Sequence, residues 1–129
     1  MYKFFARTIV LIFLVTSFAH AATEDESELL KAAFSGNIET IKQLLEKGVN
    51  VNSQNEMGFT ALIVASQFGH TDIVDQLLEK NADVTIKNAG DVTALTVAAK
   101  NGYADIVNRL LAKGADINAQ TTDGITPLM

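Results

Sequence analysis

The chain has 129 residues, and ten basic against fifteen acidic residues give it a net charge of −5. An acidic chain is poorly suited to nucleic acid and to anionic lipid surfaces, because both carry negative charge themselves. The sequence contains no cysteine, which excludes disulfides, a cysteine nucleophile and a lipid-modified cysteine.

Residues 1–21 have the pattern of a secretory signal peptide. Two basic residues near the start precede an apolar run at residues 9–18, and Ala19-His20-Ala21 then forms an A-x-A cleavage site. The run is too short to cross a membrane, although a retained leader acting as an anchor stays an alternative. We therefore predict cleavage after Ala21, a periplasmic or secreted location, and a mature domain over residues 22–129.

The predicted mature chain is more acidic than the whole, since eight basic and fifteen acidic residues give it a net charge of −7. Residues 24–28, EDESE, concentrate this charge just before the first expected helix. Such a run could contact a basic partner. We favour the simpler interpretation, in which solvated acids stabilise the N-terminus of a helix.

From Ser27 onward the sequence repeats itself at a fixed period. A self-match with a period of about 33 residues indicates stacked structural units. We expect units at about 27–55, 56–88 and 89–121, and a partial fourth unit at 122–129. The matching sets include Ser27, Thr60, Thr93 and Thr126; Leu29, Leu62, Leu95 and Leu128; Ala32, Ala65 and Ala98; and Gly36, Gly69 and Gly102.

The sequence of each unit predicts two helices joined by a short turn. In the second unit Thr60 caps a helix that starts at Ala61, and Gly69 ends it. Thr71 or Asp72 opens the next helix, whose apolar stripe ends at the pair Leu77-Leu78, with Lys80 in its last turn. Asn81 follows at a position that favours the left-handed backbone conformation. A unit this small cannot bury its apolar face alone, so it needs neighbours.

These motifs resemble the ankyrin repeat. TALIVAS at residues 60–66, TALTVAA at 93–99 and TPLM at 126–129 are similar to the start of its first helix. GHTDIV at 69–74 is similar to the start of its second helix. The resemblance spans residues 27–129 and implies an all-α solenoid of helix-turn-helix units joined by projecting β-turns.

Three departures from the family pattern stand out. The first unit is polar where its neighbours are apolar, with Lys31 in place of valine, so we expect it to act as an N-terminal cap. Asp91 stands at the turn position that Gly58 occupies one unit earlier, so the geometry of the second turn stays open. The sequence stops soon after Pro127, so we expect the flank of the third unit to be partly open and the chain to be a fragment.

By resemblance, ankyrin repeats bind proteins through the tips of the turns and the concave face of the first helices. Phe59 and Phe68 are the most notable candidates, because large apolar groups at such places act as anchors. Their alternative role is packing against a neighbouring unit. Transferred by position, the candidate partner-binding residues are Glu56, Met57, Phe59, Gln67, Phe68, Val92, Lys100 and Asn101.

No pattern of catalytic or metal-ligating residues is present. His70 is the one histidine after the predicted leader, and the resemblance to ankyrin repeats implies for a histidine after Gly69 a structural hydrogen bond between turns. The carboxylates are not spaced as an acid–base pair, and phosphate-binding glycine loops are missing. We expect no enzyme activity, no metal and no cofactor.

We therefore expect an exported, monomeric protein-binding module that contacts neither nucleic acid nor, after cleavage of the leader, a membrane. Resemblance leaves the partner open, and an inhibitor or immunity partner of a toxin is one alternative. A non-catalytic segment of a larger exported enzyme is another. A membrane-associated scaffold is the third, if the leader is retained.

Overall fold

The computed structural model describes residues 24–119, and within them the chain forms helices and turns without β-strands. The predicted all-α stack of helix-turn-helix units is confirmed. The predicted leader (1–21) and the partial fourth unit (122–129) lie outside the described residues. The pairs are the first helix (24–35) with α2 (Ile38–Glu46), α3 (Ala61–Gln67) with α4 (Thr71–Glu79), and α5 (Ala94–Lys100) with α6 (Ala104–Ala112).

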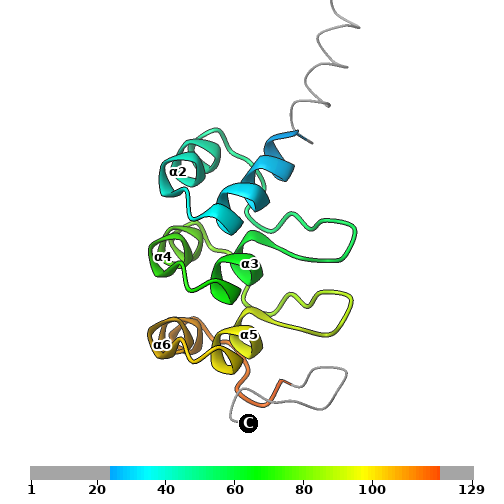
Figure 1. Cartoon of the computed structure of the whole chain (residues 1–129), viewed down its shortest axis with the longest axis vertical. Helices are drawn as coiled ribbons and strands as arrows, with labels where there is room; N and C mark the ends of the chain where they lie inside the picture. The colour runs from blue at the N-terminus through cyan, green and yellow to red at the C-terminus, as the bar shows by residue number, and fades with distance from the viewer. Residues whose placement is uncertain (1–23, 120–129) are drawn as a thin grey trace, which may run out of the picture.

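The helix pairs stack along the long axis of the molecule in two rows (Figure 1). The first helix, α3 and α5 form the inner row, and α2, α4 and α6 form the outer row. Two long turns, residues 50–59 and 83–92, project beside the inner row (Figure 1). We call the exposed side of the inner row, together with these turns, the concave face.

Threonine side chains start the inner helices. Thr60 Oγ1 accepts a hydrogen bond from the backbone N–H of Ile63 at 3.2 Å, as the sequence predicted. Thr93 Oγ1 accepts in the same way from Thr96, whose hydroxyl in turn accepts from the Thr93 N–H and completes a capping box. These bonds satisfy backbone donors that a helix start leaves unpaired.

The outer helices also begin and end close to the predicted residues. α4 begins at Thr71, with Asp72 in its first turn near the positive end of the helix dipole. Lys80, expected in the last turn, lies one residue beyond it. Asn81 then adopts a left-handed conformation with φ of 61°, as Gly48 and Gly114 do at the equivalent positions. Asparagine tolerates this conformation better than most residues, which explains its place here.

One apolar core runs through the stack between the two rows. Its largest members come from every helix, because each unit places leucine or isoleucine at the same repeat positions. Burial of these side chains between neighbouring units holds the stack together. Fully buried members include Leu29, Ile41, Leu62, Ile63, Ile73, Leu77, Leu95, Ile106 and Leu110.

The first unit is polar on its outer surface, as expected for a cap. Lys31, Lys42, Gln43 and Glu46 are all exposed. The Asp25 carboxylate pairs with the Lys47 ammonium at 2.7 Å and joins the start of the first helix to the end of α2. Because the lysine is well exposed, this ion pair contributes little to stability.

The flank of the third unit is less covered than that of the second. Val74 and Leu78 are buried in α4, whereas Val107 and Leu111, at the equivalent repeat positions in α6, are half-buried. Ile106 and Leu110 of the same helix are fully buried. This flank is therefore partly open, as predicted, at Val107 and Leu111 but not at Ile106 and Leu110.

Candidate functional site

The projecting turns are built around one asparagine each. Asn55 Oδ1 accepts hydrogen bonds from the backbone N–H groups of Met57 and Phe59, both at 3.0 Å. Asn88, at the equivalent position of the next turn, accepts from Gly90 and Val92 at 2.8 and 3.1 Å. Because the side chain replaces several missing backbone partners, each tip is held in a defined shape.

Neighbouring turns are also bonded to each other. The backbone N–H of Ala89 donates to the Met57 carbonyl at 3.0 Å. The Gln54 side-chain amide donates to the Gly58 and Lys87 carbonyls at 2.8 and 3.3 Å. The two tips therefore form one continuous edge of the concave face.

Asp91 does not change the geometry of the second turn. It adopts φ of 59° where Gly58 has φ of 81°, so both turns use a left-handed residue at this position. The Asn88–Asp91 backbone hydrogen bond repeats the Asn55–Gly58 bond at 3.0 and 2.9 Å. The sequence left the geometry of this turn open. The structure shows that the aspartate adopts the left-handed conformation that glycine has in the first turn.

Replacing Gly58 by alanine should destabilise the fold more than the same change at Gly102. Both glycines have positive φ, 81° and 79°, so each substitution costs about 1–2 kcal/mol of backbone strain. A Cβ at Gly58 would also lie 2.9 Å from the Asn88 Cα, whereas one at Gly102 meets nothing within 4 Å. Urea unfolding of the two variants tests this. Equal midpoints would show that the neighbouring turns are not in contact.

The candidate residues of the first tip differ in exposure. Met57 is 64% exposed and Glu56 is also exposed, whereas Phe59 is half-buried and packs against the core. Phe59 therefore packs as its alternative structural role predicted, while part of its side chain stays exposed. Met57 is the freer apolar side chain of this tip.

Phe68 lies at the end of α3 and is paired with an aromatic residue that the sequence analysis missed. The rings of Phe34 and Phe68 meet edge to face at 4.8 Å, and the two side chains are 61% and 42% exposed. Phe34 stands at the repeat position that the polar residues Gln67 and Lys100 occupy in the next two units. A large apolar residue at an exposed repeat position was the signal that could have identified it.

His70 supports this aromatic pair. Its ring nitrogen Nε2 lies 3.1 Å from the Phe34 carbonyl oxygen, and its ring stacks beside Phe68. The hydrogen bond joins the ends of two successive inner helices, so the predicted structural role of His70 between turns agrees with the geometry.

The candidate residues of the third unit lie along the same face. Lys100 and Asn101 are exposed at the end of α5, and Val92 is half-buried at the second tip. The Asn101 side-chain amide donates to the Gln67 carbonyl at 2.9 Å. Asn101 thus joins successive inner helices, as His70 does one unit earlier.

A groove of about 660 Å³ opens between the first helix and the first projecting turn. Its apolar lining comes from the helix and from the start of the second unit, with Leu30, Phe34, Phe59 and Val64. Glu26 and Lys31 from the helix and Glu56 from the turn also line it. The structure therefore brings Glu56 and Phe59 together in one recess, which Phe34 of the exposed aromatic pair also lines.

Comparison with known families agrees with this architecture. The family model for ankyrin repeats in three copies matches residues 8–88 and 29–121, which together cover most of the chain. The chain belongs to the ankyrin-repeat family. One match begins at residue 8, inside the predicted leader. The repeat register, by contrast, starts at Ser27.

A curated relative shows a short stretch of higher similarity. Ankyrin repeat and SOCS box protein 3 from Bos taurus is 50% identical over 40 residues. This stretch is 31% of the present chain and 8% of the cattle protein, so the chain spans only a small part of that relative. Ankyrin repeats are protein–protein interaction modules and are typically non-catalytic.

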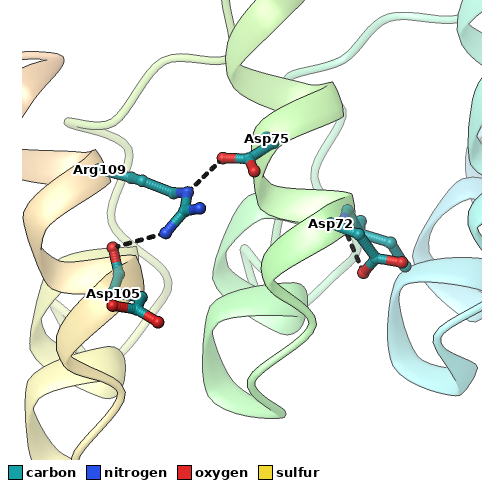
Figure 2. A network of polar contacts seen from close by, with 5 residues as sticks. Asp72, Asp75, Asp105 and Arg109 are labelled. Atoms are coloured by element: carbon teal, nitrogen blue, oxygen red, sulfur yellow. Dashed lines mark hydrogen bonds and ion pairs between the residues drawn. The ribbon is translucent and has the colours of Figure 1, made fainter.

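In this ankyrin stack two carboxylates of α4 make structural contacts. The Asp75 carboxylate on α4 accepts from Arg109 Nε on α6 at 2.6 Å, and Arg109 also donates to the Asp105 carbonyl at 3.3 Å (Figure 2). Asp72 accepts from the backbone of Ile73 and lies apart from that pair (Figure 2). The Asp75–Arg109 pair ties the successive outer helices α4 and α6 together.

The remaining titratable groups give the ankyrin repeats no metal site over residues 24–119, where no three His, Asp or Glu side chains gather. One carboxylate has a shifted pKa. The Thr85 hydroxyl and backbone N–H, donating to Asp83 Oδ1 at 2.6 and 2.8 Å, hold the pKa of Asp83 below its ordinary value. This pair fixes the chain as it leaves α4.

Asp83 should make stability fall at acid pH. Because its pKa is lower in the folded chain, ionised Asp83 stabilises the fold above its unfolded pKa, and this contribution disappears as pH falls through the folded value. The urea midpoint of wild type relative to Asp83→Asn should therefore decrease between neutral pH and about pH 3. A difference that does not change with pH would contradict this role of the carboxylate.

Proposed function

We propose that this chain is an exported protein that binds another protein through its concave face. The observation that carries the proposal is the group of large apolar side chains left exposed there. Phe34, Phe68 and Met57 are 61%, 42% and 64% exposed, all on or beside the projecting turns and inner helices. Exposed apolar groups gathered on one face are typical of protein-binding surfaces.

The rigidity of the concave face supports the same proposal. Side-chain and backbone hydrogen bonds hold both tips, and His70 and Asn101 join successive inner helices. A surface that is ordered before binding loses little conformational entropy when a partner arrives. The eight candidate residues identified from the sequence are the proposed contact set, and Phe34 is added to it.

Export is proposed from the sequence of residues 1–21, which lie outside the described residues. The basic start, the apolar run and the A-x-A site together favour cleavage after Ala21 and a periplasmic or extracellular location. Over residues 24–119, no helix is long and apolar enough to cross a membrane.

Fractionation and capture from the producing cell test both parts of the proposal. Mass spectrometry of the exported chain should find Ala22 as its N-terminus. Tagged wild-type chain should capture a partner protein. The outer-row variant Gln43→Ser should capture the same protein, whereas Met57→Ser should lose it. Intact residues 1–21 in a cytoplasmic fraction would contradict export. A partner retained equally by all three chains would contradict binding at the concave face.

A further inference from the structure

We propose that the groove between the first helix and the first projecting turn binds a cationic, apolar peptide segment of the partner. This inference rests on the proposed function and specifies its recognition chemistry. The occupant carries one large apolar side chain that packs beside Phe34. It also carries a lysine or arginine that lies near Glu26 and Glu56 at the rim.

The apolar part of the groove is suited to a single anchoring side chain. Leu30, Phe34, Phe59 and Val64 line it, and a volume of about 660 Å³ exceeds the space that one large side chain fills. Phe34 extends this surface to Phe68, because the two rings contact at 4.8 Å. A partner side chain inserted here removes exposed aromatic surface from water, which is the usual source of affinity at such anchors.

The charges in the lining of the groove favour a cation in the occupant. Glu26 and Glu56 face the groove from the helix and from the turn, and Lys31 is the one basic residue in its lining. The described chain as a whole carries fourteen acidic and eight basic residues, so its field attracts cations and repels acidic segments. Lys31 disfavours a positive charge at its own position in the lining.

The distance between Glu26 and Phe34 sets how far apart the basic and the apolar residue of the bound peptide lie. Glu26 and Phe34 are eight residues apart on one helix, which places their backbones roughly 12 Å apart along its axis. An extended peptide covers that distance in about four residues. We therefore infer a motif in which a lysine or arginine and a large apolar residue are separated by about three residues.

Selection of random peptides displayed on phage tests the inference. The targets are the full chain, the charge-reversed variant Glu26→Lys/Glu56→Lys, and the control Glu46→Lys/Glu79→Lys. The control makes the same change of charge at exposed positions of the outer helices. Wild type and control should select basic peptides with the inferred spacing. A synthetic copy of the selected peptide should bind the charge-reversed variant at least about tenfold more weakly.

The outcomes separate this inference from the proposed function. Peptides that lose binding in Phe68→Ser but ignore the charge reversal would overturn the inference and leave the concave face as a binding surface. Acidic selected peptides, or no enrichment on any target, would also overturn it, while partner capture still decides the proposed function. If the charge-reversed variant has a lower unfolding midpoint than wild type, the neutral variant Glu26→Gln/Glu56→Gln is tested in its place. It should also bind the selected peptide more weakly than wild type does.

Discussion

Leu77→Ala is expected to destabilise the fold by about 2–5 kcal/mol, which is enough to unfold much of so short a stack. Leu77 is fully buried in α4, between outer helices α2 and α6 on either side. Truncation leaves a cavity in the apolar core at α4, the helix that contacts both α2 and α6. Urea unfolding followed by circular dichroism measures the loss.

Leu111→Ala is the matched control for this prediction. It is the same chemical change in an outer helix, but Leu111 is half-buried at the flank of the third unit. Less apolar surface is lost there, so the midpoint should fall by clearly less than in Leu77→Ala. Equal losses in the two variants would show that burial within the stack does not set its stability.

The double change Phe34→Ser/Phe68→Ser should weaken binding of the captured partner by at least about 30-fold, which corresponds to about 2 kcal/mol. Both rings are substantially exposed in the free chain, where they contact each other and Phe68 also lies beside the His70 ring. Their removal should cost only about 1 kcal/mol of stability, since the aromatic pair contributes little beyond its own contact. Titration of partner against both chains measures the change.

The control for this prediction is a double change of similar size on the outer row, Gln43→Ser/Lys42→Ser. These residues are exposed on α2, away from the projecting turns. Phe59→Ala is a poorer probe of binding, because Phe59 also packs against the core and its loss changes stability as well. Undiminished binding by the Phe34/Phe68 variant would remove the aromatic pair from the proposed contact set.

Much of the fold follows from the repeat register alone. The register aligns Thr60 with Thr93, and both cap inner helices in the structure. It aligns Asn81 with Gly48 and Gly114, and all three are left-handed. Such features depend on residues close together in the chain, so local physical chemistry is sufficient to predict them.

The candidate site was harder to predict from the sequence than the fold was, because it is formed by residues of different units. Phe34 and Phe68 are not at equivalent repeat positions, and they meet only when the units stack. The Asp75–Arg109 pair likewise joins α4 to α6 across an offset of 34 residues. The groove needs both the first helix and the first turn in place. These juxtapositions are properties of stacking that no single repeat displays.

Hydrogen–deuterium exchange of the chain with and without its captured partner tests the central claim most directly. The account predicts slower exchange on binding at residues 26–34, 54–59 and 67–68, with little change in α2 and α6. Protection confined to the outer helices, with unchanged exchange in the first helix and the first projecting turn, would contradict binding at the concave face.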